Sequence, residues 1–244
     1  MKPALQLEHS ETTIDRPVSF RATGLQPGQE IVIRLQRRAV TPTSINHFVS
    51  SATFKANEKG MVDLDKDQPL RGSYSGIDGM GLIHSLEIDR TEPNEQEPYW
   101  KLAPQIMEVV LEHQESVIDR KQIKRYWKSP DVVQTAVRDN GLVATFFSSQ
   151  DGEPRPGIIV VGGSEGGIYE FPAALLASHG FNVLALGYWG IKQLPERLAY
   201  IPMEYMQQAI EWMKANTKIK EDWLGIHGTS KGGELALLAG SLFE

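Results

Sequence analysis

The stretch of sequence that decides the fold is Leu224-Gly-Ile-His-Gly-Thr-Ser-Lys-Gly-Gly-Glu234. It contains Gly228-Thr-Ser-Lys-Gly232, a sequence of the form G-x-S-x-G. The apolar run from Trp223 to His227 predicts a short buried strand before it, and the residues after it predict a helix from Lys231 to Leu242. A strand, a sharp turn and a helix are the setting in which G-x-S-x-G presents a reactive serine above a sheet.

Ser230 is the candidate nucleophile at this turn. The turn is so tight that we expect a strained backbone conformation at Ser230. Gly228 and Gly232 have no side chains, so the strand and the helix can approach each other closely around the serine. The backbone N–H of Lys231 opens the helix, where it can face a developing oxyanion.

A second glycine-rich stretch, Gly162-Gly-Ser-Glu-Gly-Gly167, follows the apolar run from Gly157 to Val161. In this kind of fold the second oxyanion donor comes from such a loop, and the N–H of Ser164 or Glu165 is the candidate. A phosphate-binding loop is the alternative, but the stretch lacks the Lys-Ser/Thr pair and the G-x-G-x-x-G spacing. The alternative is that the G-x-S-x-G sequence occurs by chance in a tightly packed turn and that Ser230 has no catalytic role.

The residues before the serine predict an α/β sheet. The apolar runs Gly157 to Val161 and Asn182 to Leu186 suit strands that are buried on both faces of a parallel sheet. Helices are expected from Tyr169 to His179, ended by Gly180, and from Met203 to Ala215. We place this second domain at residues 131–244.

Residues 1–130 have a different pattern, typical of a β-sandwich. Apolar and polar residues alternate at Val18 to Ala22, at Ile31 to Leu35 and at Ala52 to Ala56, and turn sequences lie between them. We therefore predict an immunoglobulin-like antiparallel β-sandwich. The acidic stretch from Glu87 to Pro98 is expected to be an exposed loop, and Tyr99 to Val110 favours a strand over a helix.

Composition narrows the class of protein. The net charge of −6, from 25 Lys and Arg against 31 Asp and Glu, does not favour nucleic acid as a partner. The absence of cysteine excludes a disulfide scaffold, a zinc–thiolate site and a cysteine nucleophile. His47, His84 and His113 lack metal-ligand spacing, so we propose no metal. We find no signal peptide and no apolar stretch of membrane-spanning length, and we expect a cytoplasmic protein.

Eight stretches carry a family resemblance, in the same order along the chain. In the first half they are Ser51-Ala-Thr-Phe54, Gly60-Met-Val-Asp-Leu64 and Gly72-Ser-Tyr-Ser-Gly-Ile-Asp-Gly-Met-Gly-Leu82. In the second half they are Pro156-Gly-Ile-Ile-Val-Val-Gly-Gly163, Ala174-Leu-Leu-Ala-Ser-His-Gly-Phe-Asn-Val-Leu-Ala-Leu-Gly-Tyr188, Leu194-Pro195, Pro202-Met-Glu-Tyr205 and Leu224 to Glu234. Together they resemble the two domains of the acyl-CoA thioesterase / bile acid-CoA:amino acid N-acyltransferase family.

The resemblance implies a serine-dependent acyl-CoA thioester hydrolase with an α/β-hydrolase second domain. Ser230 would form an acyl-enzyme and release the CoA thiol, and water would then give a fatty acid. CoA belongs to the substrate, so no cofactor is expected. Members that transfer the acyl group to an amino acid tend to carry cysteine at the nucleophile, so serine favours hydrolysis. An N-acyltransferase, another esterase or peptidase on this fold, and a non-catalytic binding module stay as alternatives.

A complete catalytic triad is not expected within this chain. The fold orders its triad as serine, acid and then histidine, yet all six histidines precede Ser230. Glu234 and Glu244 are the only carboxylates after the serine. His227 is expected to be a core histidine. We therefore predict a truncated hydrolase domain, inactive alone, with an unpaired sheet edge through which copies of the chain associate.

Two further features have more than one interpretation. The basic run Arg120-Lys121, Lys124-Arg125 and Lys128 is positioned to meet CoA phosphates, although a solvated strand is the favoured interpretation. Tyr188 and Trp189 follow a buried strand at the edge where α/β sheets bind ligands, so they line an acyl pocket or pack under a loop.

Overall fold

The structure of the protein, a computed structural model, describes residues 2–216 and 218–243, without the side chains of residues 221–223. It divides into two compact units, Met1–Tyr126 and Trp127–Glu244. β-Strands make up most of the regular structure, and the few longer helices lie in the second unit. The chain therefore combines a β unit with an α/β unit, which confirms the broad fold class expected from the sequence.

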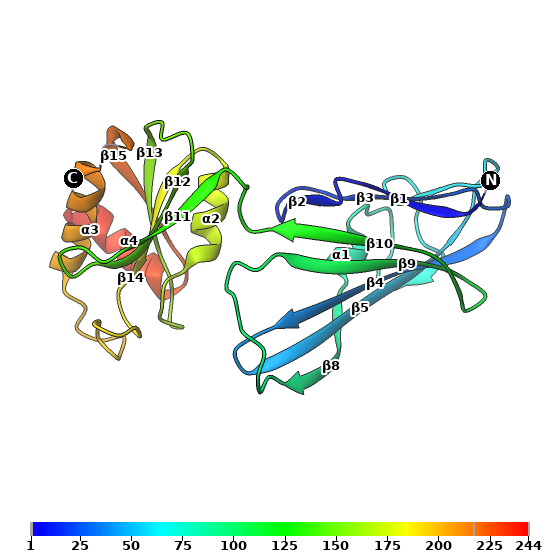
Figure 1. The fold of residues 1–244 in the computed structure, drawn as a ribbon, viewed down its shortest axis with the longest axis horizontal. Helices are drawn as coiled ribbons and strands as arrows, with labels where there is room; N and C mark the ends of the chain where they lie inside the picture. The colour runs from blue at the N-terminus through cyan, green and yellow to red at the C-terminus, as the bar shows by residue number, and fades with distance from the viewer. Residues whose placement is uncertain (1, 217, 244) are drawn as a thin grey trace. The chain divides into compact units, whose positions relative to one another are not determined.

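The first unit contains two β-sheets (Figure 1). The smaller sheet has the order β1-β3-β6, and the larger has the order β2-β10-β9-β4-β5-β7, with β8 also paired to β5. All of these pairs are antiparallel except the pair of β10 with β2. Their bounds are β1 (Ala4–Glu8), β2 (Glu11–Thr13), β3 (Ser19–Thr23), β4 (Glu30–Val40), β5 (Ser44–Lys55), β6 (Val62–Asp63), β7 (Arg71–Gly72), β8 (Glu87–Pro93), β9 (Gln105–His113) and β10 (Ser116–Tyr126); the short helix α1 spans Gly81–His84.

Both sheets contribute side chains to one hydrophobic core. Phe20 on β3 comes from the smaller sheet, and Ile33 on β4 and Phe54 on β5 come from the larger, each no more than 1% exposed. The alternation that predicted these strands is confirmed, because successive side chains of a strand point to opposite faces.

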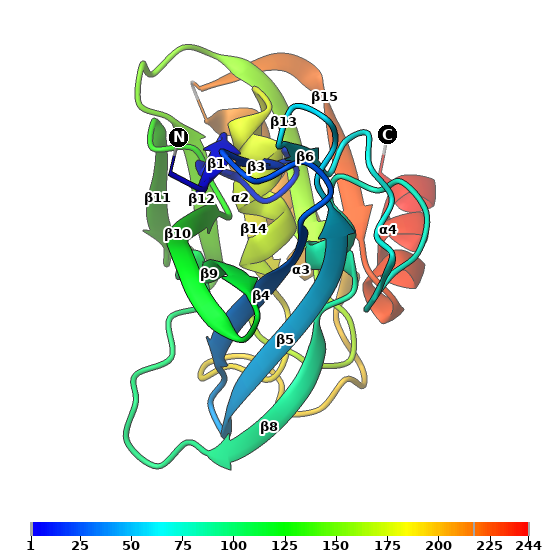
Figure 2. The same cartoon turned by 90° about the vertical axis from the view of Figure 1, so that its right-hand side faces the viewer.

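The prediction that Glu87 to Pro98 form a loop is wrong for the first part of this stretch. Residues Glu87–Pro93 form strand β8, which pairs antiparallel with β5, and Figure 2 shows the two strands side by side. All seven side chains of β8 are exposed. An edge strand whose side chains are all exposed shows no alternation of buried apolar residues, so the sequence pattern does not reveal it. The favoured strand after Tyr99 is found at Gln105–His113.

The second unit has a single five-stranded sheet, in the order β11-β12-β14-β13-β15. Strands β14, β13 and β15 are parallel, whereas β11 and β12 are antiparallel to their neighbours. The strands are β11 (Val132–Val137), β12 (Val143–Ser149), β13 (Arg155–Val161), β14 (Asn182–Gly187) and β15 (Ile219–Gly228); the helices are α2 (Glu170–Ser178), α3 (Met203–Ala215) and α4 (Lys231–Leu242). All three predicted helices are confirmed, α3 and α4 with the expected bounds.

Helices cover both faces of this sheet (Figure 1). Met206, Ala209 and Met213 of α3 pack with Leu184 and Leu186 of β14, and residues of α4 belong to the same core cluster. Helix α2 packs against β12 and β14, and Thr145 on β12 donates a hydrogen bond of 2.7 Å to its Glu170. Among the described residues, no helix is both long and apolar enough to cross a bilayer.

Replacing Phe20 with alanine tests the core of the first unit. Phe20 is fully buried, so its truncation is expected to lower the free energy of unfolding by about 3–5 kcal/mol. Ile88→Ala on β8 is the control, because Ile88 is 57% exposed, and it is expected to change stability by less than about 0.5 kcal/mol. Urea unfolding measures both, and equal losses would contradict this assignment of the core.

Candidate active site

The predicted strand–turn–helix is present around Ser230. Strand β15 ends at Gly228 and helix α4 begins at Lys231. Between them Ser230 has φ 54° and ψ −121°, a conformation that L-amino acids rarely adopt. Such a conformation costs on the order of 1–3 kcal/mol and persists only where the surrounding structure holds it. The side chain of Ser230 is exposed, so its hydroxyl is accessible.

The glycines on either side of the serine allow three backbone segments to touch. A Cβ atom on Gly228 would lie closer than 3.0 Å to the carbonyl oxygen of Gly232. A Cβ atom on Gly232 would lie equally close to the carbonyl oxygens of Val161 and Gly162, at the end of β13. Real Cβ atoms do not approach so closely, so only glycine fits at either position. The end of β15, the start of α4 and the loop after β13 are thereby packed together.

Gly163 brings that loop directly against the serine. A Cβ atom on Gly163 would lie 3.0 Å from the Cβ of Ser230 and 3.5 Å from its Oγ. The N–H of Thr229 also donates a hydrogen bond of 3.2 Å to the Val161 carbonyl. The sequence analysis did not single out Gly163, although the adjacent pair of glycines at 162 and 163 was the available signal. The loop and the serine therefore form one site.

The backbone N–H groups that the sequence analysis named as candidate oxyanion donors are without an acceptor within the described residues. In the described part of the chain, the N–H groups of Ser164, Glu165 and Lys231 donate no hydrogen bond. Ser164 and Glu165 are exposed. The ammonium of Lys231 pairs instead with Glu234 at 2.8 Å, and both side chains are on the surface.

Tyr188 and Trp189 hold this loop in place through hydrogen bonds to its backbone carbonyl groups. The Tyr188 hydroxyl donates a hydrogen bond of 2.8 Å to the Gly162 carbonyl, and the Trp189 indole N–H donates one of 3.1 Å to the Gly163 carbonyl. The Gly167 N–H donates in return to the Trp189 carbonyl at 3.1 Å. Burial raises the pKa of Tyr188, so the phenol stays protonated and keeps donating at neutral pH. Of the two interpretations, these contacts support packing under a loop.

His227 is not the core histidine that the sequence predicted. Its side chain is exposed, and its Nε2 lies 3.4 Å from the Thr229 hydroxyl. The neighbouring Ile226 points into the α3 side of the sheet, so His227 points to the opposite face. It is exposed there because β15 is the outermost strand of the sheet, paired only with β13 among the described residues.

No histidine contacts the serine in the part of the chain that the structure describes. The Ser230 hydroxyl makes no hydrogen bond there. His47 lies beside Glu92, His84 lies beside Asp78, and His113 contacts the Glu30 carbonyl, all in the first unit. Within the described residues, no group of three or more His, Cys, Asp or Glu side chains could hold a metal ion. That the chain lacks a complete triad stays a prediction.

Four of the five residues of the basic run, Arg120, Lys124, Arg125 and Lys128, make contacts within the fold. Arg120 pairs with Glu108 at 3.1 Å and Lys124 pairs with Glu11 at 3.3 Å. Arg125 is buried and donates to the carbonyls of Ile14 and Arg16, and Lys128 donates to the Val132 carbonyl. These contacts support the structural interpretation of the run over a CoA-phosphate site.

A substitution at Gly232 tests the close approach around the serine. Gly232→Ala would push a Cβ atom into the carbonyls at the end of β13, and overpacking of this kind costs about 1–3 kcal/mol or more. Gly240→Ala is the matched control in the same helix, because its Cβ would meet open space and alanine favours a helix by roughly 0.5–1 kcal/mol. Calorimetry is expected to show a lower unfolding temperature for the first variant alone. An unchanged unfolding temperature in Gly232→Ala would contradict the close packing around Gly232.

A substitution at Trp189 tests whether this side chain holds the loop. Trp189→Phe keeps an aromatic ring but removes the indole N–H that reaches the Gly163 carbonyl. We expect faster hydrogen–deuterium exchange of the amides at residues 163–167, because the loop opens more often. Trp212→Phe is the control, since Trp212 packs edge-on against Phe146, at 5.4 Å between ring centroids. If both variants exchange alike, Trp189 has no special role in the loop.

Comparisons with known proteins match both units. The family model described as "Acyl-CoA thioester hydrolase/BAAT N-terminal region" matches residues 15–139, and the one described as "BAAT / Acyl-CoA thioester hydrolase C terminal" matches residues 201–244. Mouse acyl-coenzyme A amino acid N-acyltransferase 1 is 36% identical over 238 residues, 93% of this chain and 56% of that protein. Mouse acyl-coenzyme A thioesterase 1 is 31% identical over 256 aligned positions, 100% of this chain and 59% of that protein.

A third relative, the mouse peroxisomal succinyl-coenzyme A thioesterase, is 31% identical over 241 residues, 94% of this chain and 55% of that protein. The chain thus spans little more than half the length of these curated relatives. Some relatives are named for the peroxisome or the mitochondrion, so the cytoplasmic expectation stays a prediction. With matches to both family models in order, the chain belongs to the family of acyl-CoA thioester hydrolases and bile acid-CoA:amino acid N-acyltransferases.

Proposed function

We propose that Ser230 is the nucleophile of an acyl-CoA thioester hydrolase. The observation that carries this proposal is the backbone of Ser230, at φ 54° and ψ −121°, between a strand end and a helix start. A fold keeps such strain where it serves a function, and here it exposes one hydroxyl beside free backbone N–H groups. In the fold that we propose, the first unit is an immunoglobulin-like β-sandwich and the second is built on the α/β-hydrolase plan.

The proposed reaction has two steps. The Ser230 hydroxyl gives its proton to a base, its oxygen bonds to the thioester carbonyl carbon, and the carbon–sulfur bond breaks to release CoA. Water then attacks the acyl-enzyme, which gives a fatty acid and restores the serine. In both steps the N–H of Lys231, with that of Ser164 or Glu165, would stabilise the negative oxygen. The base and its carboxylate partner are not assigned to residues of this chain.

Transfer of the acyl group to an amino acid is the second candidate function. The N-acyltransferase among the relatives, at 36% identity, favours it, whereas serine at residue 230 favours hydrolysis. Release of CoA thiol from a long-chain acyl-CoA, with and without glycine or taurine, separates the two. Hydrolysis predicts a rate that the amino acids do not change and a free fatty acid as the product.

The outer edge of β15 is the place where association with another strand is proposed. Among the described residues this strand pairs only with β13, on one side. Its free backbone groups are therefore open to a strand from a second copy or from another segment.

The substitution Ser230→Cys tests whether residue 230 acts as a nucleophile when no general base is present. The chain has no cysteine, so Ser230→Cys creates a single thiol, which is nucleophilic without a histidine and is activated near a helix N-terminus. Incubation with palmitoyl-CoA is expected to place the acyl group on residue 230 by thioester exchange. Intact-mass spectrometry follows the adduct, and the expected rate is at least about tenfold above that of a surface thiol.

Ser241→Cys is the matched control, because Ser241 is an exposed serine near the end of the same helix. Equal acylation rates for the two variants would show that the turn confers no reactivity, and the proposed nucleophile would then be wrong.

A further inference from the structure

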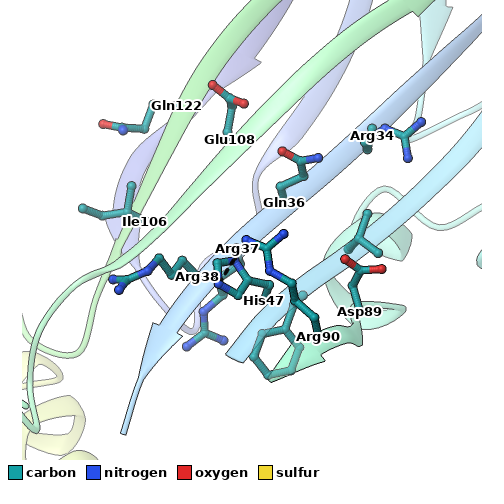
Figure 3. A pocket seen from close by; sticks show the side chains of 12 residues that line it. Arg34, Gln36, Arg37, Arg38, His47, Asp89, Arg90, Ile106, Glu108 and Gln122 are labelled. Atoms are coloured by element: carbon teal, nitrogen blue, oxygen red, sulfur yellow. Dashed lines mark hydrogen bonds between the residues drawn. The ribbon is translucent and has the colours of Figure 1, made fainter. Parts of the chain in front are cut away.

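The first unit has a hollow of about 460 Å³ along β4, β5, β8, β9 and β10 (Figure 3). Arg34 and Arg38 from β4 and Arg90 from β8 are among the residues that line it. Each of these three arginines is already paired with a glutamate, so their charges do not require a further anion. A hydroxyl group in the second unit, that of Tyr205, has contacts that bear on the proposed function instead.

The Tyr205 hydroxyl joins helix α3 to the ends of two strands. It donates a hydrogen bond of 2.9 Å to the Gly187 carbonyl at the end of β14, and it accepts one of 3.0 Å from the Val143 N–H at the start of β12. Val143 and Gly187 are paired with each other in the β12–β14 ladder. One hydroxyl thus provides both a donor and an acceptor to the backbone where this ladder ends.

Two features keep the Tyr205 hydroxyl in this place and in this state. Helix α3 begins at Met203, directly after Pro202, so Tyr205 lies in the first turn of the helix. Burial raises the pKa of Tyr205, so the phenol stays protonated and keeps donating at neutral pH. The sequence analysis assigned no role to the stretch from Pro202 to Tyr205, and the structure places its last residue at the junction of α3 with two strands.

Gly187 is crowded by two loops. A Cβ atom on Gly187 would lie 2.7 Å from the Cδ1 atom of Ile191 and 3.1 Å from the Cγ1 atom of Ile168. Ile168 directly follows the glycine-rich loop at residues 162–167, and Ile191 belongs to the loop after β14. The backbone of Gly187, to which Tyr205 is bonded, therefore supports both loops.

Gly187 also directly precedes the two residues that hold the glycine-rich loop. Tyr188 and Trp189 donate hydrogen bonds to the backbone carbonyl groups of that loop. The turn that follows them is closed by a hydrogen bond of 2.8 Å from the Gly190 N–H to the Pro195 carbonyl. A displacement of Gly187 would therefore move Tyr188 and Trp189, and with them the loop that forms the candidate oxyanion site.

We propose that Tyr205 is a positioning residue of the oxyanion site. Its hydroxyl fixes the end of β14, and the fixed strand end holds the glycine-rich loop where its N–H groups face the acyl carbonyl. Tyr205 acts through Tyr188 and Trp189 and does not itself bind the substrate. The assignment to an oxyanion site rests on the proposed function, whereas the link from Tyr205 to the loop rests on the hydrogen bonds and the packing at Gly187 alone.

The substitution Tyr205→Phe tests the proposal, because it removes the hydroxyl and keeps the ring. In the Ser230→Cys background, the maximal rate of acylation by palmitoyl-CoA is expected to fall at least about tenfold, since displaced donors stabilise the developing charge less. The palmitoyl-CoA concentration that gives half of this rate is expected to change less than about twofold, because the lost interaction acts in the transition state. The infrared carbonyl frequency of the attached acyl group is expected to rise.

Ser178→Ala is the matched control, because the Ser178 hydroxyl has the same kind of contacts in the same unit. It accepts a hydrogen bond of 2.8 Å from the Ser129 N–H and donates one of 2.9 Å to the Ala174 carbonyl, at the end of α2 that is farther along the chain from the loop. This variant is expected to leave the acylation rate and the carbonyl frequency unchanged. Equal rates and equal frequencies in the two variants would overturn the proposal.

Hydrogen–deuterium exchange separates this proposal from that of the nucleophile, because it is measured with Ser230 unchanged. Tyr205→Phe is expected to speed exchange of the amides at residues 163–167 about fivefold relative to Ser178→Ala, as the loss of a hydrogen bond predicts. Faster exchange would support the link from Tyr205 to the loop even if residue 230 is not acylated. Unchanged exchange would contradict it even if residue 230 is acylated.

A second variant covers the case in which Tyr205→Phe does not fold, as judged by circular dichroism. Ile191→Val removes only the Cδ1 methyl group, which lies nearest to Gly187. It is expected to speed exchange at residues 163–167 by a smaller factor, because the loop loses part of its support at Gly187. Exchange equal to that of the unsubstituted chain would again overturn the proposal.

Discussion

The candidate active site depends on one packing constraint, the contact of backbone with backbone at three glycines. Gly228 at the end of β15, Gly232 in the first turn of α4 and Gly162 after β13 approach so closely that two of these positions have no room for a Cβ atom. Because the helix must start this close to the strand, Ser230 takes a backbone conformation that L-amino acids normally avoid. The exposure of its hydroxyl is a consequence of that packing.

The same constraint explains why an oxyanion site can exist here. The loop after β13 is held next to the serine, since Tyr188 and Trp189 donate hydrogen bonds to the carbonyl groups of Gly162 and Gly163. With these carbonyl groups engaged, the N–H groups of Ser164 and Glu165 stay without partners in the described structure. Donors fixed before the substrate arrives stabilise a developing charge without reorganisation, which is the main requirement of the proposed chemistry.

The sequence predicted the helices and strands in which buried and exposed side chains follow a regular pattern. The bounds of α3 and α4 follow from apolar spacing and from Pro202 and the turn at Ser230, and the alternation around Phe20, Ile33 and Phe54 follows from burial. Strand β8 was missed, because it exposes every side chain and so shows no alternation of buried apolar residues. The prediction for His227 failed because the residues around it in the sequence do not show which face of β15 stays uncovered.

The surroundings of Arg37 could not be predicted from the sequence for another reason. Arg37 continues the alternation of Ile33 and Leu35 along β4, and nothing in that pattern shows that its buried Nε has no hydrogen-bond partner among the described residues. A missing partner becomes visible only when all the neighbours of a charge are known. The same holds for Gly163, whose importance lies in its distance from Ser230.

The carbonyl frequency of an acyl group attached at residue 230 tests the account's central claim most directly. Difference infrared spectroscopy with a ¹³C-labelled palmitoyl group, loaded from its CoA thioester onto the Ser230→Cys variant, measures how strongly backbone N–H groups polarise that carbonyl. We predict a lower carbonyl frequency than for the same thioester on the surface variant Ser241→Cys, because the N–H groups of Lys231 and of the loop donate to its oxygen. Identical frequencies in the two variants would contradict the proposed oxyanion site.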